Sequence, residues 1–596
     1  MNDYLLNKVE KPARYIGNEI NIIKKDVEKI DIRFALAFPD VYEVGMSHLG
    51  MEILYYFLNE RSDTYAERVY TPWIDMEELM RKANIPLFAL ETQDDLNKFD
   101  FIGFTLQYEM SYTNILTMLD LSNIPFLSND RMEEHPIIIA GGPCAYNPEP
   151  MADIIDVFYI GEGEELLNDI MDAYKDSITK EDFYRKIIDF EGIYIPRYYQ
   201  CTYNEDNTIK DFSSNIAPNK ITKVITKNLN DVYYPKKQLV PLTEIVHDRV
   251  TLEVFRGCTR GCRFCQAGYV YRPVREKMPS TLIEQGVELV NNSGHEEISL
   301  VSLSTGDYSK FSEVANGLLD KFEDCKVNLS LPSLRVDGFT INIMERIQSV
   351  RKSSITFAPE AGSQRMRDVI NKGITEEEII NGCKLCFEGG WNKLKLYFMI
   401  GLPTETIEDI LDIGELGYKI IDLNRGKAKI NISTSCFVPK PFTPFQWMKQ
   451  NSYDEFMFKQ KELKAHIKSK AIRYTYHDAK LSVLEGVFAR GDRRLSNVII
   501  KAYEKGARYD GWTEHFKYNT WVEAFEECGI DMDFYTRERC KDEILPWDFI
   551  DIGVTKNFLI DEEKKSVESK ITPNCKVKCS YCGAQKFKGG ICIDKI

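Results

Sequence analysis

The chain has 596 residues, a formal charge of −16, and 43% hydrophobic and 28% charged residues. A single hydrophobic core rarely reaches this length, so we expect several globular domains. The acidic balance argues against wholesale wrapping of nucleic acid, although a local basic patch could still bind RNA.

The first residues, MNDYLLNKVEKPARYIGNEI, are charged and lack the apolar stretch of a secretion signal. No uninterrupted apolar run approaches the roughly 18 residues that a membrane span requires. Fifteen cysteines in such a chain indicate reduced thiols and metal binding rather than disulfides. We therefore expect a cytoplasmic protein with no membrane partner.

After an N-terminal extension over residues 1–30, short apolar runs alternate with amphipathic stretches over residues 31–175. The runs are IRFALAFP, MSHLGMEILYYFLNE, FDFIGFTLQ, PIIIAGGP and VFYIGEGEE. This alternation is typical of a doubly wound α/β fold. Residues 176–243 mix helix-like and strand-like segments, and we expect them to form a connector.

Six further strand candidates follow over residues 244–480. They are RVTLEVFRGC, EEISLVSLS, VNLSLPSLRV, SSITFAPEAG, KLKLYFMIGLP and KINISTSCFVP. Six βα units predict a partial TIM barrel. Residues 481–570 are mainly helical in pattern, and residues 571–596 are dense in Cys, Lys and Gly. Such a tail has few core-forming residues, so we expect metal to hold it.

The segment CTRGCRFC places Cys258, Cys262 and Cys265 on one loop directly after the strand candidate LEVF. Iron–sulfur clusters take thiolate ligands, usually four. Three cysteines would leave one iron open to an exogenous ligand. The alternative is a zinc knuckle or three buried thiols, but zinc sites usually come as pairs of Cys-x2-Cys.

This spacing, with the aromatic Phe264 before the third cysteine, resembles the hallmark loop of the radical S-adenosylmethionine (SAM) superfamily. The resemblance implies that the open iron of a [4Fe–4S] cluster binds SAM, and that one electron cleaves SAM to a 5′-deoxyadenosyl radical. It also implies a one-electron donor such as flavodoxin or ferredoxin. Gly257 and Gly261 suit a loop wrapped tightly around a cluster.

The segment SLSTGDYS stands where the superfamily usually carries a Gly-Gly-Glu stretch that contacts the SAM amino group. Here Ser304, Thr305 and Asp307 take that place, as in the methylthiotransferase-like branch. The resemblance implies that one or more of them contact SAM. Alternatively, they cap the following helix.

Two later strand ends carry further SAM-side residues by the same resemblance. In FAPEAGSQRMRDVINKG, Glu360 and Arg365 take the places near the SAM ribose and carboxylate, and both groups suit those contacts. The alternative is a surface salt bridge at a helix start. FMIGLPTET resembles the adenine-side motif and contributes Gly401. Barrel active sites lie at strand carboxyl ends.

The segment from Asp31 onward resembles the cobalamin-binding Rossmann-like domain that precedes many radical SAM barrels. That family's Asp-x-His-x-x-Gly loop supplies a cobalt ligand, but here Tyr42 replaces the histidine, followed by Gly45. A bound cobalamin would therefore lack this ligand, and Gly141, Gly142 and the GEGE run would contact or flank it. Alternatively, the domain only packs on the barrel or recognises substrate.

The second cysteine group lies in TPNCKVKCSYCGAQKFKGGIC. Four thiols could saturate one metal, as an auxiliary [4Fe–4S] cluster or a structural zinc. Its members are Cys575, Cys579, Cys582 and Cys592. No barrel strand precedes them, so we do not expect a second SAM site.

Other polar and thiol groups have two interpretations. His477 and the stretch from Arg490 to Arg494 suit phosphate or RNA contact, but a solvated helix entry with ion pairs is the simpler interpretation. Four other cysteines in mixed apolar sequence are expected to be core thiols: Cys144, Cys383, Cys386 and Cys436.

Taken together, the chain resembles radical SAM proteins that have an N-terminal cobalamin-binding-like domain and a methylthiotransferase-like core. The resemblance implies SAM cleavage that serves methylation or methylthiolation of RNA or of a small molecule. The alternative is a catalytically silent, metal-stabilised protein that binds RNA or the ribosome. Release of 5′-deoxyadenosine by the anaerobically reduced protein separates the two hypotheses.

Overall fold

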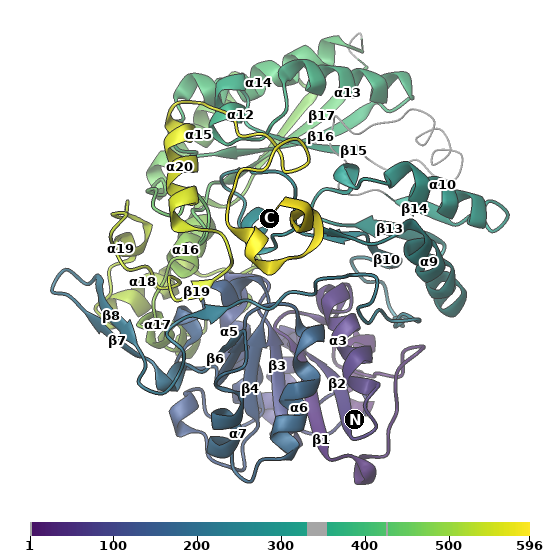
Figure 1. Ribbon diagram of the computed structural model, residues 1–596, viewed down its shortest axis with the longest axis vertical. Coiled ribbons are helices and arrows are strands. Elements are labelled where there is room, and N and C mark those ends of the chain that lie inside the picture. The colour runs from purple at the N-terminus through teal and green to yellow at the C-terminus, as the bar shows by residue number, and fades with distance from the viewer. Residues whose placement is uncertain (1–2, 331–354, 425–426, 596) are drawn as a thin grey trace.

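The structure is a computed structural model that describes residues 3–330, 355–424 and 427–595. A six-stranded sheet forms the lower half in Figure 1, and two parallel sheets form the upper half. Within the described residues, no helix is both long enough and apolar enough to cross a membrane.

The lower sheet has the strand order β2-β1-β3-β4-β5-β6, parallel except for the last pair. Its strands are β1 (Ile32–Phe38), β2 (Thr64–Tyr70), β3 (Phe101–Thr105), β4 (Ile137–Gly141), β5 (Val157–Tyr159) and β6 (Ile193–Tyr194). The central strands are buried on both faces, which explains their nearly continuous apolar sequences. The helices that flank the sheet are α3 (Leu49–Asn59), α4 (Ile74–Ala83), α5 (Tyr112–Leu121), α6 (Leu167–Lys175) and α7 (Lys180–Ile187).

The upper half contains a three-stranded and a four-stranded parallel sheet. The strands are β10 (Val250–Glu253), β13 (Glu297–Val301), β14 (Asn328–Ser330), β15 (Ile355–Glu360), β16 (Lys393–Ile400), β17 (Lys429–Cys436) and β18 (Ile472–Tyr476). Each of the six predicted segments contains a strand. The end of VNLSLPSLRV and the start of SSITFAPEAG lie outside the described residues.

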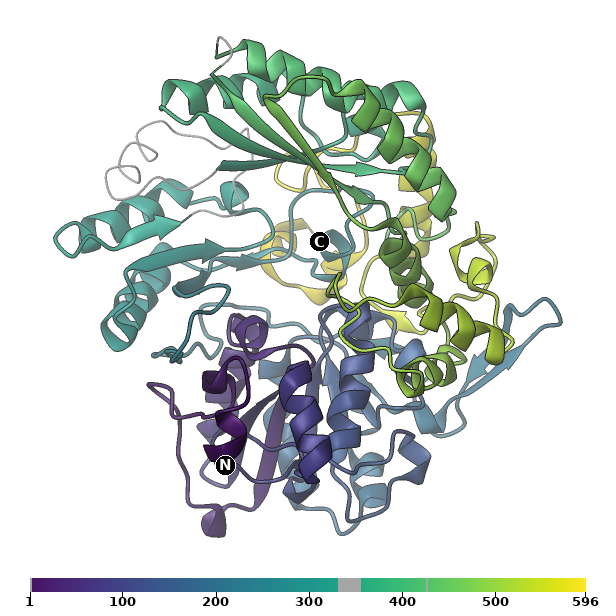
Figure 2. The ribbon, with the colours of Figure 1, turned by 180° about the vertical axis from the view of Figure 1, so that it is seen from behind.

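Helices cover the outer side of these two sheets, as expected of a partial TIM barrel (Figures 1 and 2). They are α9 (Pro279–Ser293), α10 (Phe311–Phe322), α13 (Glu376–Glu388), α14 (Ile407–Asp422) and α15 (Tyr453–His466). The fold is therefore the predicted α/β architecture of a barrel that follows a Rossmann-like sheet.

The region after the barrel is helical, and it packs back on the lower sheet. Its helices are α16 (Ala479–Ala489), α17 (Leu495–Glu504), α18 (Tyr518–Glu527) and α19 (Met532–Thr536). Ile115 of α5 shares one hydrophobic cluster with Leu484 and Trp521 of this region. The connector contributes β6 to the lower sheet, and its β9 (Ile221–Thr222) pairs with β19 (Ile550–Asp551).

The Cys-rich tail follows α20 (Lys556–Val567) and lies over the opening of the barrel, where it is coloured yellow in Figure 1. Its backbone is hydrogen-bonded to the cysteine loop, because the N–H of Cys575 donates to the carbonyl oxygen of Thr259 at 2.9 Å. Thr572 N donates to Asn371 Oδ1 at 2.9 Å, and Asn371 donates to Gly261 O at 3.0 Å. The tail is therefore part of the wall around the loop.

One arginine of the loop is bound to α20 through a buried ion pair. Arg263 is fully buried, and its guanidinium lies 3.1 Å from the carboxylate of Glu562, which is 1% exposed. It also donates to Lys570 O at 2.6 Å and to Val369 O at 2.8 Å. This contact fixes α20 against the loop.

We expect Glu562→Ala to loosen this contact, because it leaves the buried Arg263 without a counter-charge. Breaking a buried pair from one side costs about 3–5 kcal/mol. The free energy of local opening of α20, measured by hydrogen exchange of its amides, should fall by about that amount. Glu568→Ala, which removes only the exposed pair with Lys570, is the matched control and should leave the exchange unchanged. Equal exchange in both variants would contradict the assignment.

Candidate active site

The three loop cysteines follow β11 (Phe255–Arg256), at the carboxyl end of the first barrel strand. The turn into the loop requires glycine at position 257, where φ is +86° and a Cβ atom would lie 2.6 Å from Tyr271 O. The loop then bends back on itself, with Cys265 N donating to Cys262 O at 3.1 Å.

The loop thiols are partly buried and lie near one another. Desolvation and the neighbouring Cys262 thiol together raise the pKa of Cys258 to about 12 and that of Cys265 to about 11. Across residues 3–330, 355–424 and 427–595, no three His, Cys, Asp or Glu side chains stand close enough together to hold a metal ion in this conformation. Three neighbouring thiols nevertheless suit iron, once they lose their protons and rotate together.

Ser304, Thr305 and Asp307 lie beside the cysteine loop. The side chains of Ser304 and Asp307 already make hydrogen bonds within the protein. Ser304 Oγ donates to Asp307 at 2.6 Å, and Arg260 Nε donates to the same carboxylate at 2.9 Å. The three residues form a short turn, and α10 begins later with Lys310 as its N-cap. They therefore do not cap that helix, and Asp307 binds an arginine of the loop.

Glu360 and Arg365 follow β15 and make separate ion pairs. Glu360 pairs with Lys372 at 3.1 Å, and both charges act on the thiol of Cys265. Arg365 is 41% exposed, pairs with Asp409 and donates to Thr404 O at 2.9 Å. Glu360 thus lies at the cysteine loop, while Arg365 is bound to the start of α14.

Gly401 ends β16 in a tight turn. Its φ is +83°, and a Cβ atom there would lie 2.4 Å from the ring of Phe456. Its N–H donates to Glu405 at 2.7 Å, and Glu405 pairs with Lys459 at 2.8 Å. The close Phe456 ring therefore requires glycine at position 401. The hydrogen bond to Glu405 also brings the backbone of Gly401 close to the Glu405–Lys459 ion pair.

A cavity of about 710 Å³ lies between the carboxyl edge of the lower sheet and the cysteine loop. Its lower wall includes Gly141, Gly142 and His48, and its upper wall includes Arg256 and Gly257, directly before Cys258. This volume is in the range of cofactor-sized sites. Much of the remaining wall is apolar, including Leu36, Leu49, Ile53, Leu54, Ile139 and Val301.

Tyr42 and Gly45 do not line this cavity. Tyr42 is 2% exposed, donates its hydroxyl to Glu19 at 2.9 Å and packs edge-on against Tyr70. A Cβ atom on Gly45 would lie 2.3 Å from the Tyr70 ring. Both residues therefore pack inside the lower domain, and the cavity is reached instead by the residues that follow them, Ser47 and His48.

His48 is held in one tautomer. Its Nδ1 accepts the N–H of Met51 at 3.1 Å as the N-cap of α3. Burial lowers the pKa of His48 to about 4, although a hydrogen bond with Gln107 opposes this shift. The neutral ring then carries its proton on Nε2, and a protonated nitrogen does not coordinate a metal. Sequence reasoning missed His48, although it lies only three residues after Gly45.

Arg256 joins the GEGE run of the lower domain to the cysteine loop. It pairs with Glu162 at 2.9 Å, with Glu164 at 2.6 Å and with Glu253 at 2.8 Å. Arg275 adds a second buried cation to Glu162 at 2.7 Å. The cavity is therefore closed on this side by an ion network.

The second cysteine group lies near the first one in space. Arg272, which is 4% exposed, lies close enough to the thiols of Cys582 and Cys575 for their charges to raise its pKa. The same guanidinium donates to Arg260 O of the first loop at 3.2 Å. Sequence reasoning placed these four cysteines in a separate tail, and the structure brings that tail to the loop.

The arginines after α16 point into the protein. Arg490 is fully buried and donates to the carbonyls of Gln446 and Met448 at 3.2 and 2.9 Å. Arg493 pairs with Glu149 at 2.9 Å. These contacts leave neither guanidinium for RNA. The ion pair of Arg493 agrees with the simpler interpretation, but the expected solvated helix entry is wrong for the buried Arg490. The four predicted core thiols, Cys144, Cys383, Cys386 and Cys436, are buried.

Two family models and an archaeal relative match this chain in sequence. The family model described as "Radical SAM proteins, N-terminal" matches residues 50–196, and that of the radical SAM superfamily matches residues 252–417. An uncharacterized protein of Methanocaldococcus jannaschii is 30% identical over 472 residues, which make up 78% of this chain and 90% of that protein.

Two more distant similarities concern methyltransferases. An uncharacterized methyltransferase of Pyrococcus horikoshii is 24% identical over 325 residues, which make up 53% of this chain and 63% of that protein. One solved structure is that of the radical SAM methyltransferase TsrM from Kitasatospora setae, with cobalamin and a [4Fe–4S] cluster bound. The structural match covers 69% of this chain and 76% of the TsrM chain. Its TM-score is 0.45 and its identity 11%.

The superfamily match spans the cysteine loop and barrel strands β10 to β16, and the archaeal relative is similar over most of its length. The chain therefore belongs to the radical SAM superfamily, whose enzymes use a [4Fe–4S] cluster and SAM.

Proposed function

We propose that the chain is a radical SAM methyltransferase that uses the cavity between the lower sheet and the barrel as its reaction chamber. One observation carries the proposal: a cavity of about 710 Å³ extends from Gly141 and Gly142 to Gly257, directly before Cys258. A group bound at the lower sheet and a group bound at the loop would meet in this space.

Cys258, Cys262 and Cys265 would hold the iron of the catalytic cluster. When bound, the cluster supplies one electron to the sulfonium of SAM, whose C5′–S bond breaks to give methionine and a 5′-deoxyadenosyl radical. Glu360 supports a SAM site because its carboxylate acts at Cys265 and suits ribose hydroxyls. Asp307 positions the loop through Arg260.

Four more proposed SAM contacts require different arguments. Ser304 and Thr305 support the turn that holds Asp307. The Phe456 ring fills the space beside the Gly401 Cα, so Gly401 would contact SAM through its backbone at the carboxyl end of β16. Arg365 would have to exchange its pair with Asp409 for the SAM carboxylate. We therefore propose Glu360 and Gly401 as the more direct contacts.

The lower wall of the cavity suits a corrinoid. Gly141 and Gly142 offer backbone without side chains, and most of the neighbouring wall is apolar. Tyr42 is buried elsewhere. His48 already uses its Nδ1 lone pair for the Met51 N–H, so its neutral ring carries the proton on Nε2. A cobalamin bound here would have no histidine ligand from this loop.

The acceptor of the methyl group would be a small molecule or one protruding group of an RNA, because the cavity is partly open to solvent and lies between two domains. A low-potential carrier such as flavodoxin or ferredoxin would supply the electron. All fifteen cysteines are free thiols, which supports a reducing, cytoplasmic setting. The inward-pointing Arg490 and Arg493 remove the main support for a purely RNA-binding protein.

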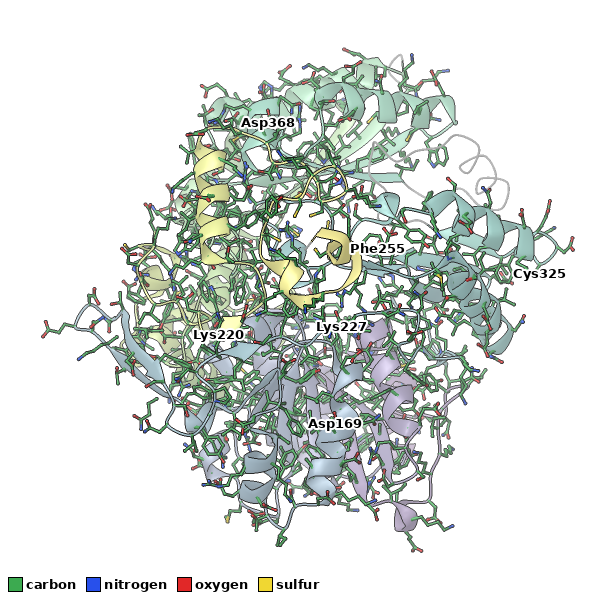
Figure 3. All side chains as sticks on the ribbon, in the orientation of Figure 1. Asp169, Lys220, Lys227, Phe255, Cys325 and Asp368 are labelled. Atoms are coloured by element: carbon green, nitrogen blue, oxygen red, sulfur yellow. The ribbon has the colours of Figure 1, made fainter. Side chains whose placement is uncertain are left out.

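We expect Cys262→Ala to abolish the SAM-responsive [4Fe–4S] cluster, because two thiolates do not hold the open-iron cluster on this loop. Visible absorbance of the anaerobically reconstituted protein and release of 5′-deoxyadenosine should both fall to background. Cys325→Ala, at an exposed cysteine beyond α10 (Figure 3), should retain both signals. Equal SAM cleavage by the Cys262 variant and the parent would refute the site.

We expect Cys579→Ala to remove one metal site from the tail, because a saturated site needs all four thiolates. Metal analysis should show a loss of about one zinc or about four irons, while the SAM-responsive signal of the loop persists. Cys540→Ala, at another exposed cysteine, is the control. A point variant is preferable to truncation, because the tail backbone is bonded to Thr259. Unchanged metal content would exclude the tail site.

We expect corrinoid to bind without a nitrogen ligand from the protein. Protein loaded with cobinamide, which lacks the benzimidazole nitrogen of cobalamin, should give a Co(II) electron paramagnetic resonance spectrum free of nitrogen splitting. Tyr42→His should give the same spectrum, because position 42 faces Glu19 and Tyr70 rather than the cavity. If neither protein binds corrinoid, even after refolding with hydroxocobalamin, the case for methyl transfer is lost.

A further inference from the structure

The Cys-rich tail is a basic segment on an acidic protein. Residues 569–593 contain five lysines and no Asp or Glu, whereas the whole chain carries a formal charge of −16. The lysines, all of them exposed, are Lys570, Lys576, Lys578, Lys586 and Lys588. Such a local reversal of sign attracts an acidic partner and orients it before contact.

Several of these positive charges have no counter-charge from the protein. Lys576 pairs with Glu276 and Lys586 pairs with Asp551. Lys578 and Lys588 make no ion pair with any residue in the described parts of the chain. Exposed Lys227 extends the basic surface, because its Cα lies 3.8 Å from the Cβ position of Gly589. Figure 3 shows Lys227 at the lower border of the tail.

Apolar side chains project between these lysines. Ile571 is 62% exposed, Val577 is 76% exposed and Tyr581 is 74% exposed. Exposed apolar and aromatic side chains rimmed by charge are typical of protein-binding surfaces. The tail therefore offers both parts of an interface, a small apolar centre and a basic rim.

This surface lies directly over the cysteine loop. Cys575 N donates to Thr259 O, which lies between Cys258 and Arg260 in sequence, and Lys576 Nζ donates to Asp307 O. A protein bound to the tail is therefore separated from the loop by a single layer of polypeptide (Figure 1).

We infer that the tail is the docking surface for the electron donor, a small acidic one-electron carrier protein. The inference rests on the proposed function and names the partner of the same site. The reduced carrier loses one electron, and the sulfonium of SAM gains it as the C5′–S bond breaks. The products are the oxidised carrier, methionine and the 5′-deoxyadenosyl radical.

An acidic protein fits this surface better than RNA does. Residues 569–593 contain no arginine, and arginine is the side chain that best combines phosphate pairing with base stacking. The exposed Ile571 and Val577 have no role against a phosphate backbone, whereas they suit the apolar centre of a protein interface.

The test uses the full-length reconstituted protein and an acidic flavodoxin hydroquinone as the probe. The variant K578E/K588E reverses the two lysines that lack ion pairs, and K210E/K321E reverses two exposed lysines on β8 (Ile209–Ser213) and α10, away from the tail. Stopped-flow absorbance follows cluster reduction at several salt concentrations. A parallel assay measures 5′-deoxyadenosine with dithionite, which needs no docking.

We expect K578E/K588E to slow reduction by flavodoxin about tenfold at low salt and to flatten its salt dependence. Its dithionite assay should match the parent, and K210E/K321E should match the parent in both assays. The inference fails if K578E/K588E is reduced at the parental rate, or if neither an acidic flavodoxin nor an acidic ferredoxin reduces the parent. The inference also fails if, in a separate tRNA-binding assay, K578E/K588E binds tRNA less tightly than the parent while flavodoxin still reduces it at the parental rate. Absence of 5′-deoxyadenosine with dithionite in the parent would instead refute the proposed function.

Discussion

The cysteine loop is held in place by its own arginines, and each binds a different part of the molecule. Arg256 pairs with Glu162 of the lower domain, Arg260 with Asp307 after the second barrel strand, and Arg263 with Glu562 of α20. The last pair is fully buried, and breaking such a pair from one side is expensive. Because the cysteines alternate with these arginines along the chain, the geometry of the proposed cluster site depends on all three neighbouring regions.

The sequence predicts strands well where a continuous run of apolar side chains is buried, and poorly where charged side chains are buried in ion pairs. The apolar runs of β1, β3, β4 and β16 are visible locally, because parallel strands are covered on both faces. β2 contains Arg68, which is buried between Glu19 and Glu91. Those partners lie 49 and 23 residues away, so no local pattern reveals that this edge strand is buried. The alternating strand β18 is missed for a similar reason, since its exposed Arg473, Thr475 and Tyr476 resemble a surface segment.

The residues of the candidate site also fall into two groups, those that the local sequence predicts and those that only the fold reveals. The spacing of Cys258, Cys262 and Cys265 is a local feature, so the sequence is enough to propose their role. The position of Tyr42 in a motif says nothing about the direction of its side chain, and the turn α2 (Tyr42–Gly45) directs the ring into the domain. His48 reaches the cavity because it begins the next helix at the sheet edge. The approach of the tail depends on contacts about 300 residues apart in sequence, such as Arg263 with Glu562.

Arg272 couples the two cysteine groups electrostatically. It is buried, and within the described parts of the chain its side chain hydrogen-bonds the carbonyl oxygens of Gly268 and Arg260 but pairs with no carboxylate, while the Cys582 thiol lies nearby. A buried guanidinium without a counter-charge is costly. Metal binding converts thiols to thiolates, so loading the tail with metal would place negative charge beside Arg272. The same guanidinium donates to Arg260 O, and a metal-loaded tail would therefore stabilise the loop that carries Cys258 and Cys262.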